Sequence, residues 1–406
     1  MRDGPLRVTM IGRRVAPAHG PGGLETVVRE QALEIAGCGI EVDLWTELPR
    51  DSERRARAEA AFADRVRLHW VAPGPLPLGR MRGTVILDRI TNYPWWSHRV
   101  ARAIGDPGDI VHVQGLAGLG AAARRRAGDW RVPMVLTTQG MEEFLVAGLK
   151  RALYAPFRAG MRGIAAASDR VIVTDRALVP VVGALLDLNP DQAVVIPNAI
   201  YPDTGPAVAD CEAARRLLAG AGHADREFKL VSMGRFEANK GFELLAAALG
   251  RVKDTLGDWV WVLIGDGPRR EMIEAALAAA GIQDRCLLVG RVAEPLKHGL
   301  LASADWFVHP TLFEGSSIVT LEAMAHGLPV LGTRAGGLPD KVETGVSGFL
   351  VEPGNVEELS AALSDSRAAP AAEFGARGRA LVEERFSWNV VRPAFAKLYS
   401  ELARTR

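Results

Sequence analysis

Strand-like and helix-like segments alternate along almost the whole chain, and this alternation limits the fold more than any other feature of the sequence. Short apolar runs recur, and each is followed by a turn marked by Gly or Pro and then by a stretch with helical apolar periodicity. Strands separated by helices are joined by crossover connections, so they pair in parallel within one sheet. The runs expected to form strands are 6–11, 40–44, 110–113, 133–137, 170–174, 194–198, 229–233, 259–264, 286–289, 306–309, 329–332 and 348–351.

The chain is long enough for two domains. Its 406 residues exceed the roughly 250–300 residues at which a single hydrophobic core stops growing. The strand pattern also restarts at Lys229, after a stretch that contains Pro202 and Pro206. The expected fold class is therefore α/β, with two Rossmann-like, doubly wound parallel-sheet domains that face each other across a cleft. The expected boundaries are a first domain at 1–200, a linker at 201–226, a second domain at 227–386 and a last helix at 387–406.

Charge and cysteine content exclude several classes of protein. The formal net charge is +1, so the chain lacks the basic excess of a nucleic-acid-binding protein. Cys38, Cys211 and Cys286 are too few and too scattered for a disulfide framework or a zinc site, which fits a reducing compartment. No apolar stretch approaches the ~20 residues that cross a bilayer, and the first residues do not resemble a signal peptide. A cytoplasmic location is expected.

The segment 305–326 gives the strongest indication of function. An apolar strand-like run is followed by the turn Glu-Gly-Ser-Ser, which starts at Glu314, and then by a helix-forming stretch that contains Glu322. A helix N-terminus presents unpaired backbone N–H groups and a positive dipole end, which accept an anion such as phosphate. The amides of Ser317 and Ile318 could therefore bind phosphate, and the two carboxylates could bind hydroxyl groups. This combination predicts a nucleotide-sugar site; the alternative is an ordinary strand–helix crossover with two surface acids.

Two further turns could approach a phosphorylated ligand. Arg235 leaves a strand end and Lys240 precedes the next helix, so the two cations could converge on one diphosphate. Gly22 and Gly23 precede a helix and would let a ligand come close to the backbone. The Gly-x-Gly-x-x-Gly spacing is absent both here and at 265–268. A nicotinamide or flavin dinucleotide site is therefore disfavoured.

Taken in order, these segments resemble the GT-B retaining glycosyltransferases of glycosyltransferase family 4, also called glycosyl transferases group 1. The resemblance covers nearly the whole chain, and the ordered set of motifs is specific although each motif is weak alone. The motifs that carry it are Gly234-Arg235…Lys240-Gly241, Gly265-Asp-Gly-Pro268, Glu314-x7-Glu322, Pro329-Val, Gly336-Gly337, Gly345-x-x-Gly348-Phe-Leu-Val-x-Pro-Gly354, Gly22-Gly23 and Ile196-Pro-Asn198.

The resemblance implies a role for each candidate residue. Arg235 and Lys240 hold the donor diphosphate and stabilise it as it leaves. Glu314, the third residue expected to be catalytic, contacts hydroxyls of the transferred sugar, and Glu322 binds the ribose hydroxyls. The last helix, from about Trp388, is expected to cross back and pack on the N-terminal domain, which binds the acceptor. The other implied donor contacts are Gly22 and Gly23 to the diphosphate, Arg291 and Val292 to the base, and Ser316, Ser317 and Ile318 in the turn between the two acids.

Two positions depart from the family pattern. Family members often have a His in the strand-end sequence that here reads Thr-Thr-Gln139-Gly, and Gln can bind a sugar hydroxyl but cannot act as a general base. Ser316 and Ser317 replace the commoner Phe-Gly, so the fit around the donor sugar is not predicted. His19, in the Gly-rich loop, could face the acceptor. His309 ends a strand beside the site and could be either a functional or a packing residue.

Neither a metal nor a cofactor is expected, because the nucleoside-diphosphate sugar is a substrate. The chain has no Asp-x-Asp motif to hold a divalent cation on the diphosphate. Arg235, Lys240 and the helix N-terminus could supply the positive charge instead. The resemblance further implies retention by same-face attack, in which the leaving phosphate helps to deprotonate the acceptor hydroxyl.

The expected function is transfer of a hexose-type sugar from a nucleoside-diphosphate sugar to a hydroxyl of a glycan, a lipid-linked acceptor or a small molecule. The alternatives are a GT-B-like nucleotide-sugar 2-epimerase and a non-catalytic nucleotide-sugar binder. The sequence does not predict the base, the sugar, the acceptor or the oligomeric state. A basic amphipathic stretch, broken by Pro156, could make a weak peripheral contact with the inner face of a membrane, although a solvated face is the simpler interpretation. Its cations are Lys150, Arg151, Arg158 and Arg162.

Overall fold

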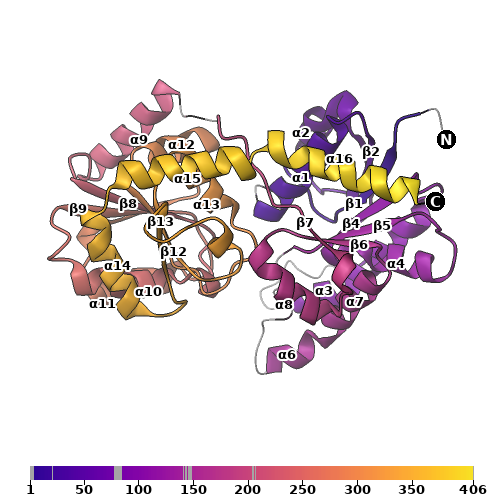
Figure 1. Ribbon diagram of the computed structural model, residues 1–406. Helices are drawn as coiled ribbons and strands as arrows, with labels where there is room; N and C mark the ends of the chain where they lie inside the picture. Colours follow the sequence, from indigo (N-terminus) through magenta and orange to yellow (C-terminus); the bar gives the residue numbers. More distant parts are fainter. Residues whose placement is uncertain are drawn as a thin grey trace. The chain divides into compact units, whose positions relative to one another are not determined.

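The computed structural model describes residues 4–20, 22–76, 85–139, 141, 144, 149–203, 205 and 207–405. The chain forms two compact units (Figure 1). Unit 1 comprises Met1–Asn198 together with Trp388–Arg406, and unit 2 comprises Ala199–Ser387. Unit 1 is therefore discontinuous in sequence, because its last helix follows the whole of unit 2.

Unit 1 contains a seven-stranded sheet in the order β3-β2-β1-β4-β5-β6-β7. All of its strand pairs are parallel. The order reverses between β1 and β4, which is the kind of position where open α/β sheets form a ligand crevice. The strands are β1 (Arg7–Ile11), β2 (Glu41–Glu47), β3 (Arg67–Val71), β4 (Ile110–Gln114), β5 (Met134–Thr137), β6 (Arg170–Val173) and β7 (Ala193–Val195).

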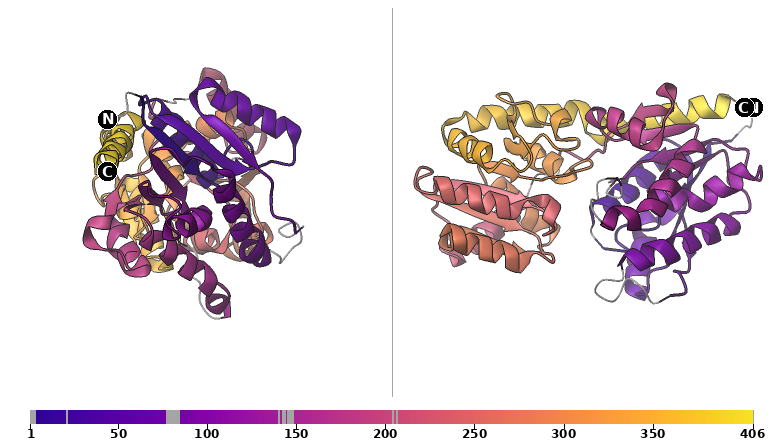
Figure 2. Two further views of the ribbon diagram at one scale, coloured as in Figure 1. Left: turned by 90° about the vertical axis from the view of Figure 1, so that its right-hand side faces the viewer. Right: turned by 90° about the horizontal axis from the view of Figure 1, so that it is seen from below.

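Helices cover both faces of this sheet (Figure 1 and Figure 2). On one face α1 contacts α16, which in turn contacts β4. On the other, α4 contacts both α3 and α7, and α7 contacts α8. The α-helices are α1 (Gly23–Ala36), α2 (Ser52–Phe62), α3 (Val85–Ala103), α4 (Leu119–Arg126), α6 (Leu149–Leu153), α7 (Ala155–Ala166), α8 (Val179–Leu186) and α16 (Trp388–Arg404), and the short 3₁₀ turns are Ala63–Arg65, Gly115–Gly118, Arg176–Leu178 and Pro190–Gln192.

Unit 2 contains a six-stranded parallel sheet in the order β10-β9-β8-β11-β12-β13. Its strands are β8 (Phe228–Met233), β9 (Trp259–Ile264), β10 (Cys286–Gly290), β11 (Trp306–His309), β12 (Val330–Thr333) and β13 (Gly348–Val351). Its helices are α9 (Val208–Gly220), η5 (Ala238–Lys240), α10 (Phe242–Val252), α11 (Arg270–Ala280), η6 (Gln283–Arg285), α12 (Glu294–Ala302), α13 (Ile318–Ala325), η7 (Leu338–Asp340), α14 (Val356–Ala368) and α15 (Ala371–Arg385).

The sheet of unit 2 is buried on both faces, as β9 illustrates. Trp259 and Trp261 lie in a core cluster that includes buried residues of α10, α11 and α14. The intervening Val260 and Val262 lie in a second cluster with residues of α12 and α13. Side chains alternate across a strand, so a strand covered by helices on both faces reads as a continuous apolar run. This is why the sequence pattern locates these strands well.

The stretch expected to be a linker is mostly part of unit 2. Residues 199–203, 205 and 207–226 belong to that unit, and α9 packs against α12. Gly299 of α12 lies against the α9 backbone, because a Cβ there would come within 2.2 Å of the carbonyl oxygen of Asp210. Pro202, one of the two Pro residues that suggested a linker, precedes this helix, and Pro206 lies outside the described residues.

Strand β3 was not predicted, and the last helix packs where the resemblance implied. The hydroxyl of Tyr399 in α16 lies 2.8 Å from Nδ1 of His112 in β4, so α16 is tied to the centre of the unit 1 sheet.

No helix in the described parts of the chain is long and apolar enough to span a membrane. The three cysteines are free thiols.

Candidate active site

The turn between β11 and α13 is fixed at its helical end by Ser317. Ser317 is the N-cap of α13, and its Oγ accepts a hydrogen bond from the backbone N–H of Thr320, at 3.4 Å, and from the Thr320 hydroxyl, at 2.8 Å. A serine at this position satisfies one of the free amides of the first helical turn. The Ser-Ser sequence therefore has a local structural reason, and the first turn of α13 carries no acidic residue.

The turn that contains Arg235 and Lys240 packs directly on this segment. The carbonyl oxygen of Asn239 accepts hydrogen bonds from the backbone N–H of Leu312, at 2.6 Å, and from the Thr311 hydroxyl, at 2.8 Å. The side-chain amide of Asn239 donates to the carbonyl of Phe313 at 3.3 Å. Gly241 has φ 68°, and a Cβ there would lie 2.1 Å from the carbonyl oxygen of Pro310. This close approach requires glycine.

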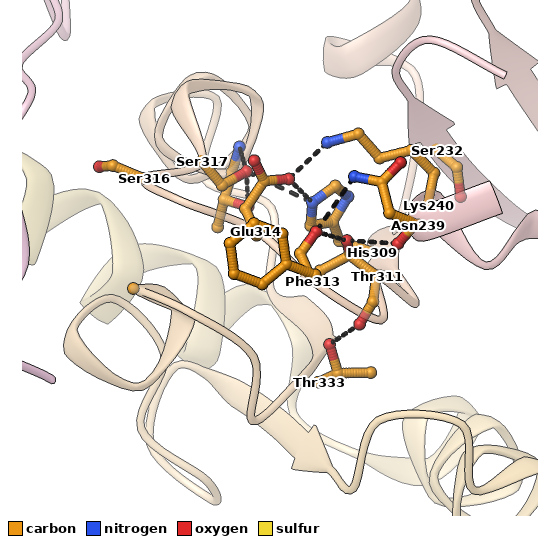
Figure 3. A network of polar contacts seen from close by, with 12 residues as sticks. Ser232, Asn239, Lys240, His309, Thr311, Phe313, Glu314, Ser316, Ser317 and Thr333 are labelled. Carbon is orange, nitrogen blue, oxygen red and sulfur yellow. Dashed lines mark hydrogen bonds and ion pairs between the residues drawn. The ribbon is translucent and has the colours of Figure 1, made fainter. Parts of the chain in front are cut away.

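Lys240 and His309 converge on one oxygen of Glu314 (Figure 3). The Nζ atom of Lys240 donates to Oε2 of Glu314 at 2.5 Å, and Nε2 of His309 lies 3.0 Å from the same oxygen. Burial would raise the pKa of Glu314, but the hydrogen bond with His309 and the charge of Lys240 outweigh burial and lower it to about 2. Glu314 is thus ionised at neutral pH and held by two partners.

Arg235 does not share these contacts. Its side chain is 66% exposed and pairs with Glu237, whose Oε1 lies 3.1 Å from the Arg235 Nε. The residue before it, Gly234, lies against the Lys240 side chain, because a Cβ built on Gly234 would lie 3.8 Å from Cδ of Lys240. Of the two cations predicted to act together, Lys240 is therefore bound to Glu314 and Arg235 is paired with Glu237.

Glu322 has a buried partner that the sequence did not reveal. Lys297 of α12 donates from Nζ to Oε1 of Glu322 at 2.9 Å and to Oε2 of Glu294 at 2.5 Å. Burial would lower the pKa of Lys297, but the charge of Glu322 and the bond to Glu294 outweigh this and raise it. Arg291 is exposed and Val292 packs partly against the core, both in the loop just before α12.

Residues 336–341 pack against the turn from another side, a contact that the sequence did not predict. Lys341 is completely buried, and its Nζ donates to Oγ of Ser316 at 3.3 Å and to the carbonyl of Gly337 at 3.2 Å. The Ser316 side chain points away from the Glu314 carboxylate (Figure 3). Gly336 has φ 55°, and a Cβ there would meet the carbonyl oxygen of Glu314 at 1.7 Å. This explains the Gly336-Gly337 motif as a packing requirement.

In unit 1, Gly22 and Gly23 form the start of α1. Gly22 is the N-cap residue, and its carbonyl accepts the Thr26 N–H at 2.9 Å. His19 precedes them; its Nδ1 accepts the backbone N–H of Val15 at 3.1 Å, and its buried Nε2 has no partner among the described residues. Burial lowers the pKa of His19, although its backbone contact with Val15 opposes this.

Gln139 ends a chain of neutral polar side chains in unit 1. Its Nε2 donates to Oε1 of Gln114 at 3.3 Å, and Nε2 of Gln114 donates to Oε1 of Gln31 at 2.9 Å. Gln31 and Gln114 are buried and belong to α1 and β4. Gln139 is thereby oriented from the centre of the sheet, whereas Gly140, which follows it, lies outside the described residues.

The basic amphipathic stretch forms two helices, α6 and α7, because Pro156 lies in the first turn of a new helix. Arg158 donates to the carbonyl of Arg151 at 2.7 Å, and Arg162 pairs with Asp187 at 3.4 Å. These cations are engaged within the unit. Contact with a membrane stays a prediction.

Comparison with known proteins gives two family matches in tandem. The family described as Glycosyltransferase Family 4 matches residues 21–204, and the one described as Glycosyl transferases group 1 matches residues 227–366. D-inositol 3-phosphate glycosyltransferase of Kribbella flavida is 29% identical over 96% of this chain and 94% of its own length.

Two solved structures share the fold. Sucrose-phosphate synthase from Thermosynechococcus elongatus superposes with a TM-score of 0.80 at 22% identity, over 99% of this chain and 100% of that one. Anabaena HepE in complex with UDP-glucose superposes with a TM-score of 0.73 at 18% identity, over 98% and 100%.

Proposed function

This chain belongs to glycosyltransferase family 4 (glycosyl transferases group 1), and we propose that it transfers a hexose-type sugar from a nucleoside diphosphate to an acceptor hydroxyl with retention of anomeric configuration. Membership of this family makes the chain a glycosyltransferase with the GT-B fold, as its sequence motifs predicted. The donor, the stereochemistry and the acceptor are the parts proposed here.

One observation carries the proposal: an ionised acid, a cation and a helix N-terminus meet at the end of the central strand β11. Glu314 and Lys240 are joined at 2.5 Å, three residues before the N-cap of α13. The backbone amides of Ser317 and Ile318, at the N-terminus of α13, and the Lys240 ammonium would provide positive charge for a diphosphate. The carboxylate of Glu314 can accept hydrogen bonds from sugar hydroxyls. These groups match the two halves of a nucleotide sugar.

The other candidate residues complete the proposed donor site. Glu322, held by Lys297, would accept from the ribose hydroxyls, and Arg235 would turn from Glu237 to the diphosphate. The proposed peripheral contacts are the backbone at Arg291 and Val292 to the base, Ser316 beside the sugar, and Gly22 and Gly23 to the diphosphate. His19 and Gln139 are proposed to face the acceptor.

The proposed chemistry places positive charge where negative charge develops. As the glycosidic C–O bond breaks, the leaving diphosphate gains charge, which Lys240, Arg235 and the amides of α13 would stabilise. The acceptor hydroxyl attacks the same face and its proton passes to the leaving phosphate, so no protein base is needed. This arrangement needs no divalent cation. A rate that falls to background with EDTA and returns with Mg²⁺ would contradict that part of the proposal.

The donor can be identified by binding before any product is sought. We expect one of UDP, GDP, ADP or TDP to raise the melting temperature of the protein, because a ligand that binds only the folded state stabilises it. The matching sugar nucleotides are then incubated with acceptors, starting with D-inositol 3-phosphate, the compound named for the Kribbella flavida relative. Proton NMR of the product should show an anomeric configuration equal to that of the donor. Inversion would overturn the retaining mechanism.

A 2-epimerase would act on the donor alone. Incubation of the selected sugar nucleotide without acceptor separates the two functions, because epimerisation changes the sugar while the nucleotide stays attached. We expect the donor to be recovered unchanged apart from slow hydrolysis.

A further inference from the structure

We infer that His309 is a positioning residue for Glu314: its imidazole fixes one carboxylate oxygen so that the other is presented to the donor sugar. The inference rests on the proposed function, in which Glu314 contacts sugar hydroxyls. The sequence left His309 undecided between packing and function. Its contacts give it a defined task.

The imidazole comes from the most rigid part of the site. His309 is the last residue of β11, which lies between β8 and β12, and it is paired with Gly332 in the sheet. Its side chain is fully buried and stacks on Phe307, with ring centroids 5.8 Å apart. Glu314, in contrast, lies on a turn. The hydrogen bond from His309, which is held in the strand, therefore restricts the side chain of Glu314, which could otherwise move.

The chemistry of the carboxylate assigns the proton. Oε2 of Glu314 can only accept, so the His309 nitrogen 3.0 Å away must carry the hydrogen. His309 is thus the neutral tautomer with its hydrogen on Nε2. Burial lowers its pKa despite the opposing bond to Glu314, which disfavours a second proton. The other nitrogen, Nδ1, is buried without a partner among the described residues, so protonation there would leave a buried N–H unsatisfied.

The two oxygens of Glu314 have different environments. Oε2 takes both Lys240 and His309, whereas Oε1 has no hydrogen bond to any residue that the structure describes. The side chain keeps 15% of its surface exposed, so it is accessible to a ligand. A carboxylate fixed through one oxygen presents the other in a single direction, which is what recognition of one sugar hydroxyl requires.

His309 becomes most important when the donor is bound. In the proposed site, Lys240 binds the diphosphate of the donor as well as Glu314. As the ammonium turns toward phosphate, the contact with His309 stays on Oε2 and keeps the carboxylate from rotating. Nε2 of His309 also lies 3.4 Å from Oγ of Ser317, the N-cap of α13. One imidazole thereby links the acid to the start of the phosphate-facing helix.

The test compares two variants. His309→Leu removes the hydrogen-bond donor to Glu314, and His309→Gln keeps an N–H group on a side chain of similar reach. Binding of UDP and UDP-glucose, and of GDP and GDP-mannose, is measured by calorimetry, and kcat and KM by product formation. For His309→Leu we expect kcat/KM to fall about tenfold or more. Affinity for the sugar nucleotide should fall as well, while affinity for the nucleoside diphosphate without its sugar should change less than about threefold. His309→Gln should recover most of both losses.

His223→Gln is the matched control, since His223 is another buried histidine of unit 2. It should leave kcat/KM unchanged, even if it lowers the melting temperature as much as the His309 variants do. A His309→Leu enzyme with kcat/KM within about twofold of wild type, or a His309→Gln enzyme as impaired as His309→Leu, would overturn the inference.

A second measurement needs no donor. Imidazole ¹⁵N NMR of the unliganded protein should show His309 neutral with its hydrogen on Nε2, and Glu314→Gln should shift that resonance. A hydrogen on Nδ1 would overturn the inference. If wild-type protein binds none of UDP, GDP, ADP and TDP, the proposed donor site fails, while the NMR result still decides whether His309 holds Glu314.

Discussion

The two units have sheets of the same kind, yet the polar side chains at their central strand ends differ in character. In unit 2, Lys240 and Glu314 form an ion pair in the turns that follow β8 and β11, and Lys297 and Glu322 form a second one between α12 and α13. In unit 1, at the ends of β4 and β5, Gln114 and Gln139 form a chain of neutral amides. Ion pairs can exchange a partner for a charged ligand, and neutral amides can bind hydroxyl groups without attracting charge.

This difference fits a division of labour between donor and acceptor. A diphosphate needs cations that are already oriented, and unit 2 pairs the half-buried Lys240 and the buried Lys297 with carboxylates. A sugar-like acceptor substrate needs neutral groups in fixed positions that can donate and accept hydrogen bonds. Gln114 is buried and held by its hydrogen bond to Gln31, and it in turn accepts a hydrogen bond from Gln139. The comparison can be tested by removing charge from one unit and amides from the other.

Lys240→Ala should have the largest effect. Loss of a charge-assisted contact to the diphosphate costs on the order of 1.5–3 kcal/mol, so kcat/KM should fall roughly tenfold to a hundredfold. Steady-state kinetics with the selected donor measures it. Lys253→Ala, a lysine of unit 2 outside the site, should behave like wild type. Unchanged turnover in Lys240→Ala would remove the basis for assigning donor binding to unit 2.

Lys297→Met tests whether the ion pairs of unit 2 are coupled. The variant leaves Glu322 partly buried without its cation, and loss of a hydrogen bond between charged groups should lower the free energy of unfolding by about 2 kcal/mol. Urea denaturation followed by tryptophan fluorescence measures this. Combining it with Glu322→Leu should restore much of the stability but not nucleotide binding. If the double variant binds nucleotide like wild type, Glu322 does not hold the ribose.

Gln114→Leu makes the corresponding change in unit 1 and should have a smaller effect. It breaks the chain between Gln31 and Gln139, at a cost of about 1 kcal/mol in stability. Because the donor is expected to bind unit 2, the Kd for the nucleoside diphosphate should stay within about twofold of wild type. The acceptor KM should rise instead. A loss of nucleotide affinity as large as that in Lys240→Ala would end the proposed division.

The smallest expected effect is on the pH dependence of stability. The pKa of Glu314 is lowered to about 2 from an ordinary 4.5, so its contribution is present above pH 4.5 and is lost as the pH falls toward 2. Burial lowers the pKa of His112 to about 3 from 6.5, so the folded protein is progressively destabilised as the pH falls from 6.5 toward 3, where only the unfolded chain protonates this histidine. Glu314→Gln and His112→Gln should each flatten the pH dependence of the free energy of unfolding only in their own window, as measured by urea denaturation at a series of pH values.

The sequence located most of the fold because buried parallel strands read as apolar runs. Strand β3 was not predicted because it is an edge strand in which Arg67 and His69 interrupt the apolar pattern. Both side chains pair with Asp43 of the neighbouring β2, at 2.9 and 2.8 Å. Such a strand is stabilised by its neighbour rather than by a core on both faces. No local sequence pattern around β3 indicates that Asp43 of β2 is its partner.

The candidate site was predictable only where its residues directly follow strands of the sheet. Glu314 could be placed near Lys240 because both follow strands that end at the same edge of one sheet. No sequence pattern singles out Lys297 or Lys341, because each is bound by a side chain far away in the sequence, Glu322 for Lys297 and Ser316 for Lys341. His309 could not be assigned for the same reason, since its meaning depends on which oxygen of Glu314 it meets.

The discontinuity of unit 1 has a consequence for synthesis on the ribosome. Residues 388–405 emerge only after all of unit 2, so the first unit must wait for its own last helix. Until then His112 lacks the hydroxyl of Tyr399, and the face of the sheet that α16 covers stays open to water. Unit 2 can fold during this interval from contiguous chain. We expect the second unit to finish first, and its completion to deliver α16 to the unit that was translated earlier.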